Sequence, residues 1–438
     1  MRKFLVLCMC ALVSGGSFAT PKVAGAEAAT PLPMSTPAAV GLSAERLEHM
    51  AAFFRAEVER NEAAGYTLMV ARYGKLVYQA TGGMRDLERG VPMSLDTRFR
   101  ITCMTKPVTS VAVLMLYEDG RFKLDDPISK YLPEFSSPTV YTGTNVAGAL
   151  QTTPAKHPIT IRQLLSNSAG LGYGYDYDLV SPLGKSWLAL PMGGSLADTV
   201  REIARLPLYF EPGESWRYSY AQDVLGRLVE VVSGMPFERF LGTRLFSPLG
   251  MSHTGFSIAA GDAPLLATVY RNTAAGGLEV ADISAFEMRW ASGGVGLIST
   301  TGDYLRFAQM LANGGKLDGR RYLSPVTVGL LTSSQVPADA MFKFWGADSL
   351  GRGYGLGVSV ILDAAHSPQA DLTGDYAWNG RLDTHWVVSP ESGLVAVLLK
   401  QIDNRGAYAS QQTDPYFRNL LFAAVDQLKS PAGPQAAH

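Results

Sequence analysis

Cysteine is scarce in this sequence, and the scarcity restricts both how the chain is stabilised and which thiol can take part in chemistry. The 438 residues contain three cysteines, of which Cys8 and Cys10 lie in an apolar stretch near the N-terminus. If export removes that stretch, Cys103 is the only thiol left and no internal disulfide can form. We therefore expect an apolar core to stabilise the fold, and the 47% share of hydrophobic residues is ordinary for such a core.

Charged residues are also sparse. They make up 18% of the chain, the net charge is −1, and neither sign forms a long run. A protein that binds a phosphate backbone needs basic residues clustered on one face, so we expect no nucleic-acid partner. The composition is too apolar for a disordered chain and is typical of a globular enzyme.

The N-terminal apolar run is too short to span a membrane. It covers residues 4–13, follows two basic residues and ends at Ser-Gly-Gly (14–16), whereas a spanning helix needs about 20 apolar residues. Residues 17–19 then supply a small-x-small cleavage site. The pattern predicts a signal peptide at 1–19 and an exported protein, periplasmic or extracellular, with no stable membrane span after signal removal. An uncleaved anchor is the alternative.

Strand patterns are concentrated towards the two ends of the chain. After an Ala-, Pro- and Thr-rich flexible leader at 20–40, two β-rich runs at 66–71 and 76–80 are joined by a glycine turn that is typical of a hairpin. Between 125 and 290 there is little strand signal, and short helices, turns and loops alternate. Further strands are predicted at 354–362, 374–388 and 393–401, and helices at 42–61, 102–119, 302–313 and 414–429.

These patterns predict an α/β fold in which both chain ends contribute to one sheet. Residues 41–125 and 291–430 form the expected discontinuous α/β domain, and residues 126–290 form an inserted, mostly helical domain. The chain is long enough for two such units. A cleft between them is a common place for a functional site.

Cys103 and Lys106 form the sharpest chemical pattern in the sequence. Residues three apart share a face of a helix, so both side chains are expected side by side in the first turn of the helix predicted at 102–119. The helix N-terminus and the lysine both favour a thiolate. A neutral lysine can take the proton of the thiol, and a charged one can stabilise its anion. Because this spacing also occurs by chance, other motifs have to support it.

The segment around Cys103 resembles a motif of known enzymes. Residues 99–110 are similar to the S-x-x-K block of class C β-lactamases, DD-peptidases and family VIII carboxylesterases, with cysteine in place of the nucleophilic serine. The resemblance extends over residues 40–428. It implies a β-lactamase/transpeptidase-like fold, an α+β arrangement with an antiparallel sheet flanked by helices, and an acyl-enzyme mechanism with no cofactor. Similar blocks follow in the same order at 160–171, 211–213, 216–219 and 292–300.

By the same resemblance, Tyr218 matches the tyrosine that begins the Y-x-N motif of these enzymes. A phenol close to a lysine can act as general base and then protonate the leaving group. A core tyrosine is the alternative interpretation. Tyr220 occupies the third motif position, where lactamase-like members have an asparagine that contacts the substrate amide, and this difference argues against a specialised lactamase.

Trp378, Asn379 and Gly380 resemble the W-x-G version of the family's K-T-G triplet, which lies on the strand beside the site. Gly380 would let the substrate approach the strand closely. The backbone N–H groups of Cys103 and Arg381 would form the oxyanion hole, which needs two donors. Loss of the triplet's lysine favours neutral esters, unless Arg381 replaces that charge. The alternative for Trp378 is a half-buried strand aromatic.

The histidines do not predict a metal site. Only one cysteine remains to join them, so we expect no zinc. His385 follows Arg381 by four residues on the same predicted strand, and it either lines the pocket or serves at the surface or in packing. Lys400 has no phosphate-binding context and receives no role. The histidines without metal-ligand spacing are His157, His253, His366 and His385.

The sequence therefore predicts an exported acyl-hydrolase: a carboxylesterase for short-chain esters, acting through an acyl-enzyme on Cys103 with Lys106 and Tyr218 as base and acid. A β-lactamase or DD-peptidase is the alternative enzyme. The cysteine leaves three interpretations open: a working thiol nucleophile in an esterase, thioesterase or acyltransferase; a protein that binds acyl compounds or peptidoglycan fragments without turnover; or a change introduced to trap a complex. The expected partner is a small-molecule ester or amide, and no oligomeric state is indicated.

Overall fold

The structure is a computed structural model that describes residues 31–173, 181–190, 193–284, 287–345, 349–403 and 409–428. The signal peptide expected at 1–19 lies outside these residues, as does part of the leader expected at 20–40. Both stay predictions, and so does export. Across the described ranges, no helix combines the length and the apolar character that a bilayer crossing requires.

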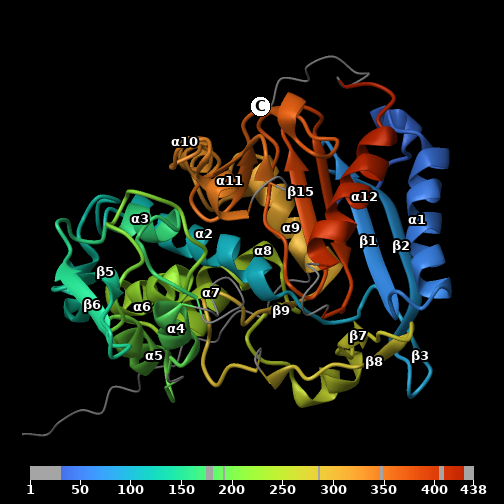
Figure 1. The fold of residues 1–438 in the computed structure, drawn as a ribbon. Helices are drawn as coiled ribbons and strands as arrows, with labels where there is room; N and C mark the ends of the chain where they lie inside the picture. Colours follow the sequence, from blue (N-terminus) through green and yellow to red (C-terminus); the bar gives the residue numbers. More distant parts are fainter. Residues whose placement is uncertain are drawn as a thin grey trace, which may run out of the picture.

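Both ends of the chain contribute strands to one antiparallel sheet (Figure 1). Within the described residues its order is β12-β13-β14-β15-β16-β1-β2-β3, and β1 joins the two halves by pairing with β16. The predicted α/β fold with an antiparallel sheet is therefore confirmed. The strands are β1 (Gly65–Arg72), β2 (Lys75–Asp86), β3 (Val91–Pro92), β12 (Arg352–Tyr354), β13 (Ser359–Ile361), β14 (Tyr376–Ala377), β15 (Thr384–Ser389) and β16 (Leu394–Leu399).

The side chains of β1 explain why the sheet is covered on both faces. Successive residues of a strand point to opposite faces, and every residue of β1 is buried. Leu68 and Val70 belong to the core under α1 and α12, whereas Met69 and Ala71 belong to the larger core on the other face. A strand of this kind is stable only between two layers.

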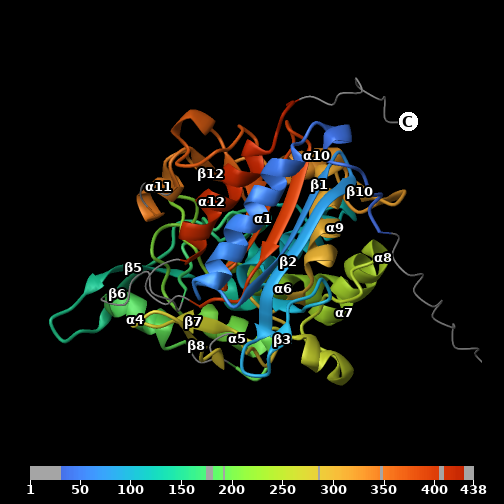
Figure 2. The same cartoon turned by 90° about the vertical axis from the view of Figure 1, so that its right-hand side faces the viewer.

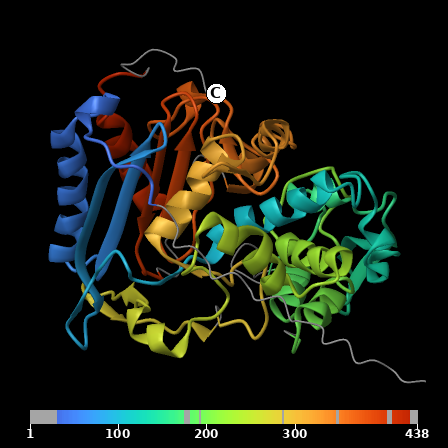
Figure 3. The ribbon, with the colours of Figure 1, turned by 180° about the vertical axis from the view of Figure 1, so that it is seen from behind.

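Helices supply those two layers. α1 (Ala44–Glu59) and α12 (Ala409–Ala423) cover one face (Figure 2), and α9 (Thr301–Ala312) covers the opposite face (Figure 3). The predicted helix at 42–61 is confirmed as α1, which begins after Ser43, whose hydroxyl accepts the N–H of Arg46 as an N-cap. The helices predicted at 102–119, 302–313 and 414–429 are confirmed as α2 (Thr105–Glu118), α9 and α12, of which α12 begins and ends several residues earlier than predicted.

A mostly helical region lies beside the sheet, and α2 (Thr105–Glu118) connects the two (Figure 1). Every residue of α2 up to Leu116 is buried, and the helix packs on α6 (Ala221–Ser233). Two short hairpins, at 139–154 and 270–280, lie in the region where the sequence showed little strand signal. The boundaries predicted for the helical domain, 126 and 290, stay predictions. The remaining elements include α3 (Ile161–Leu165), α4 (Pro182–Leu188), α5 (Leu196–Ile203), α7 (Phe237–Leu241), α8 (Ser247–Leu249), α10 (Pro325–Leu331), α11 (Ala340–Trp345), and the pairs β4 (Phe99–Arg100) with β9 (Ile298–Ser299), β5 (Thr139–Thr144) with β6 (Leu150–Pro154), β7 (Tyr270–Asn272) with β8 (Leu278–Val280) and β10 (Lys316–Leu317) with β11 (Arg320–Arg321).

The prediction of one strand over 374–388 is wrong. The chain turns between β14 and β15, which pair with each other antiparallel. Asp383 has a φ of 60°, in the left-handed region that an extended strand does not use. Arg381 therefore lies in a turn, whereas His385 lies on β15. The expectation that the two residues share a strand is wrong.

Candidate active site

Cys103 lies at a sharp transition from strand to helix. A 3-10 turn, Thr102–Met104, connects the end of the β4 segment to α2. Thr102 has a φ of 42°, which is unfavourable for a β-branched residue, and strain of this kind is concentrated at functional sites. Cys103 is partly exposed, and its backbone N–H belongs to the first turn of a helical segment, where N–H groups have no intrahelical acceptor. The thiol is therefore accessible and close to the partial positive charge of a helix N-terminus.

Lys106 lies one turn further on, and it is completely buried. Its Nζ donates a hydrogen bond to the carbonyl of Gly294 at 2.9 Å and lies 4.4 Å from the centre of the Tyr218 ring. Burial lowers the pKa of Lys106 below its ordinary value, although the charges of Cys103 and Asp223 act in the opposite direction. A neutral amine in this position keeps a lone pair that can accept a proton.

Asp223 supplies a buried carboxyl group behind Lys106. It lies on α6 and accepts a hydrogen bond from the hydroxyl of Ser292 at 2.6 Å. Burial raises the pKa of Asp223, and the bond from Ser292 and the charge of Lys106 counter that effect only in part. A Cβ on Gly294 would lie 2.9 Å from the Asp223 carboxylate and 3.4 Å from Lys106 Nζ. Because Gly294 has no side chain, Lys106 Nζ and the Asp223 carboxyl group can both pack against its backbone.

Tyr218 completes the group expected around Cys103. The side chain is buried, and aromatic rings surround it at centre-to-centre distances of 5.2 Å for Tyr173, 5.5 Å for Trp378 and 6.5 Å for Trp216. This packing fixes the Tyr218 ring beside Nζ of Lys106. The structure thus brings Lys106, Tyr218 and Trp378 together, as the motifs predicted.

Tyr220 belongs to the same aromatic cluster as Tyr218, because both rings pack on Tyr173. Its ring lies 4.4 Å from Tyr173 and 6.5 Å from Trp187, and its N–H donates to the carbonyl of Gly172. The ring therefore anchors the loop that leads into α6.

Gly380 packs against the chain that leads into Cys103. A Cβ on Gly380 would collide with the carbonyl of Ile101 and the hydroxyl groups of Thr102 and Thr384. Thr384 also donates a hydrogen bond to the Ile101 carbonyl at 3.3 Å. Glycine is thus needed here for the approach of two protein segments, a reason that differs from the expected approach of substrate.

The rest of the W-x-G triplet is held by its neighbours. The carbonyl of Trp378 accepts the indole N–H of Trp386 at 2.8 Å. The side-chain oxygen of Asn379 is buried, and no group in the described part of the chain donates a hydrogen bond to it. The guanidinium of Arg381 forms an ion pair with Asp403 at 3.2 Å. That pairing compensates the positive charge of Arg381 beside the triplet.

Two further residues support the site and were missed by the motif analysis. Asn167, with a φ of 55°, donates to the hydroxyl of Tyr354 at 3.0 Å and accepts from Ser219 at 2.9 Å. Tyr354 in turn lies 5.1 Å from Trp378. Asn167 therefore connects the loop of Tyr218 to the strand beside the triplet. Asn167 lies within the 160–171 block, which by itself gave it no role, because its partners Ser219 and Tyr354 are distant in sequence.

His385 and Lys400 lie in the interior of the protein and not at its surface. Both are buried and form ion pairs with Asp383, at 2.7 Å and 2.8 Å. In the described residues, no group of three or more His, Cys, Asp or Glu side chains is arranged to hold a metal ion.

Comparison with known proteins identifies the family. The family model described as Beta-lactamase matches residues 50–415. The chain belongs to the beta-lactamase family. Esterase EstB of Burkholderia gladioli is 32% identical over 398 residues, which cover 83% of this chain and 92% of that protein. Protein Rv1367c of Mycobacterium tuberculosis is 35% identical over 353 residues, which cover 77% and 86%.

A solved structure agrees with the assignment to the beta-lactamase family. The structure of EstCE1, described as a hydrolase with promiscuous acyltransferase activity, superposes with a TM-score of 0.72. It is 26% identical and covers 85% of this chain and 99% of its own. The resemblance inferred from the motifs and the prediction of a hydrolase are thereby confirmed.

Proposed function

We propose that this protein is an exported carboxylesterase for short-chain esters that forms a thioester acyl-enzyme on Cys103. The observation that carries the proposal is the complete burial of Lys106 beside Tyr218, in the helical turn that follows an accessible thiol. Burial lowers the pKa of Lys106, and this favours the neutral amine that can serve as a base. The esterase name of the Burkholderia relative supports the same chemistry.

The reaction follows from these positions. The Cys103 sulfur attacks the ester carbonyl while its proton passes to the Lys106–Tyr218 pair. The oxyanion is bound by the backbone N–H groups of Cys103 and Arg381. The Tyr218 hydroxyl then protonates the departing alkoxide, and a thioester remains on Cys103. Water gives one proton to the same pair and attacks the thioester. The carbon–sulfur bond then breaks, the pair returns the proton to the Cys103 sulfur, and the carboxylic acid leaves.

Neutral esters fit the site better than anionic β-lactams do. Arg381 is the cation nearest to the triplet in sequence, and its charge is already paired with Asp403. Tyr220 packs among aromatic rings where an amide-binding asparagine would be needed. Both features favour an esterase over a β-lactamase or a DD-peptidase.

Hydrolysis of p-nitrophenyl butyrate by the original protein and by Cys103→Ala and Cys103→Ser variants tests the proposal. We expect turnover by the original protein and none by Cys103→Ala. An inert original protein together with an active Cys103→Ser variant would show a disabled or trapped serine-type enzyme. Faster hydrolysis of a chromogenic cephalosporin than of the ester would show the lactamase alternative.

Export rests on residues 1–19 alone, whose basic start, apolar run and small-x-small end are typical of a signal peptide. N-terminal sequencing of protein recovered from the periplasm or the medium tests this part. We expect the mature chain to begin shortly after Ala19. Recovery of the uncleaved chain from the membrane fraction would show an anchor.

A further inference from the structure

The turn that carries Arg381 is fastened at both ends. At its start, Gly380 lies against Ile101 and donates its N–H to the carbonyl of Thr384 at 2.8 Å. At its end, the carbonyl of Asp383 accepts the backbone N–H of Lys400 at 3.2 Å. The left-handed φ of Asp383 closes the turn, although it is unfavourable for most residues other than glycine.

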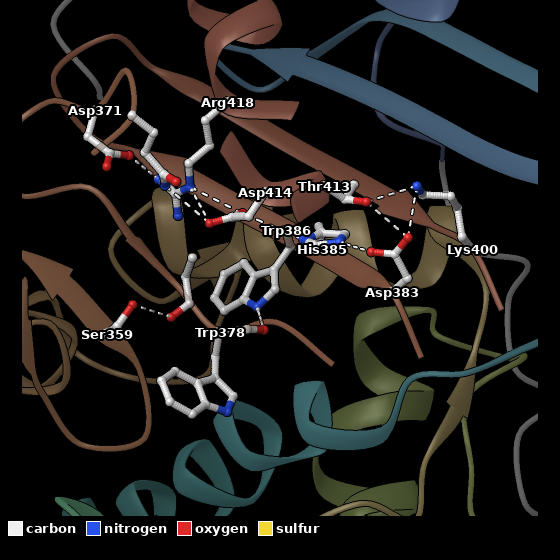
Figure 4. Close-up of polar contacts among 12 residues, drawn as sticks. Ser359, Asp371, Trp378, Asp383, His385, Trp386, Lys400, Thr413, Asp414 and Arg418 are labelled. Atoms are coloured by element: carbon white, nitrogen blue, oxygen red, sulfur yellow. Dashed lines mark hydrogen bonds and ion pairs between the residues drawn. The ribbon is translucent and has the colours of Figure 1, made fainter. Parts of the chain in front are cut away.

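The side chain of Asp383 is held by three donors in a fully buried position (Figure 4). His385 Nε2 lies 2.7 Å from one carboxylate oxygen, and the other oxygen lies 2.8 Å from Lys400 Nζ and 3.0 Å from the hydroxyl of Thr413. Burial acts to raise the pKa of Asp383, but the charge of Lys400 and the bond from His385 outweigh it and lower the pKa to about 2. The group is therefore a carboxylate at neutral pH.

The groups that bind Asp383 are themselves paired with other charged residues. Lys400, which directly follows β16, also binds Glu57 of α1 at 2.8 Å. His385 Nδ1 lies 3.5 Å from Asp414 of α12, which is paired with Arg418 at 3.3 Å. Burial acts to lower the pKa of His385, but its bonds to Asp383 and Asp414 raise it overall. Charges buried this deeply are expensive to desolvate, so the cluster as a whole adds little stability over apolar residues of the same volume, although loss of a single member is costly. A role in fixing the geometry of the surrounding chain explains better why these charges are buried around Asp383.

We propose that Asp383 is a positioning residue that holds the backbone N–H of Arg381 in place for the oxyanion. This inference rests on the proposed function. Arg381 lies between Gly380, which is packed against the segment that leads into Cys103, and the anchored end of the turn at Asp383. An oxyanion hole needs donors aimed before the reaction begins. Loss of the anchor lets the turn move and misaligns the donor, although Asp383 itself touches no reacting atom.

The test distinguishes an effect on the position of the Arg381 N–H from an effect on the reactivity of the Cys103 thiol. Asp383→Asn and a milder pair, Thr413→Val and Thr413→Ser, are compared in two reactions of Cys103. Acylation by p-nitrophenyl butyrate needs the oxyanion hole, whereas alkylation by iodoacetamide does not. We expect acylation to slow roughly 10-fold or more in Asp383→Asn and Thr413→Val, with KM and the alkylation rate unchanged. Thr413→Ser keeps the hydroxyl donor and should restore the acylation rate.

Hydrogen exchange of the backbone at 380–383 gives a readout that needs no turnover. Exchange should quicken in Asp383→Asn and stay unchanged in Asp303→Asn, which removes a buried carboxylate of α9 outside this cluster. Unchanged exchange in Asp383→Asn, or an equal loss of acylation and alkylation, overturns the proposal. If the original protein is never acylated, the esterase function fails, and the exchange rates alone still decide whether Asp383 fixes the turn.

Discussion

Replacing Gly294 by alanine perturbs the proposed base without removing any of its groups. The added Cβ would lie 2.9 Å from Asp223 and 3.4 Å from Lys106 Nζ. Neither group can move away easily, because both are buried and Ser292 donates to Asp223 at 2.6 Å. Overpacking in a core costs about 1–3 kcal/mol. A shift of about 1 Å in a catalytic group lowers the rate roughly 100-fold.

Thermal unfolding and the rate of p-nitrophenyl butyrate hydrolysis measure these two effects. Gly329→Ala is the matched control, because the new Cβ meets no atom within 4 Å outside the backbone of its own helix, α10. Helix propensity predicts that this control gains about 0.5–1 kcal/mol in stability at an unchanged rate. A Gly294→Ala variant that unfolds and turns over like the original protein would refute the close packing of Lys106 and Asp223 inferred here.

Three further predictions concern the same site. Lys106→Met should lower the acylation rate roughly 100-fold or more. In the original protein the rate should rise with pH and reach a plateau below pH 10.5, the ordinary pKa of a lysine, because burial lowers the pKa of Lys106. Gly380→Ala should abolish ester hydrolysis, because its Cβ collides with Ile101 and Thr384, and an active variant would contradict that contact. Asp383, with a pKa of about 2, contributes stability that is present above its unfolded pKa of about 3.9 and is lost as pH falls through about 2. Acid titration of urea unfolding should show that the original protein loses about 3 kcal/mol more than Asp383→Asn does.

The motif residues could be predicted from the sequence because the residues of each motif are close together in the chain. Cys103 and Lys106 are three residues apart, in a 3-10 turn and in the first turn of α2 that follows it, and helical spacing was enough to predict that they are neighbours. The aromatic and glycine pattern around Trp378 was similarly compact. The alternation of strands and helices at the two chain ends predicted the sheet for the same reason: periodicity is a property of neighbouring residues.

The supporting groups could not be predicted because they depend on distant pairings. Lys400 and Glu57 are 343 residues apart and meet only when β16 packs beneath α1. Asp223 has no neighbour in sequence that marks it as a partner of Lys106. The turn at Asp383 interrupts a β-rich stretch, and its unfavourable φ is stabilised by Lys400 and Thr413, which the local pattern does not contain.

The central claim is that Cys103 carries the acyl group. The most direct measurement is the intact mass of the protein after rapid mixing with p-nitrophenyl butyrate, followed by peptide mapping and treatment with hydroxylamine. The account predicts one butyryl group per chain, located on Cys103, removed by hydroxylamine, and absent from Cys103→Ala. An unmodified Cys103 during turnover, or a butyryl group on another residue that persists in Cys103→Ala, would contradict it.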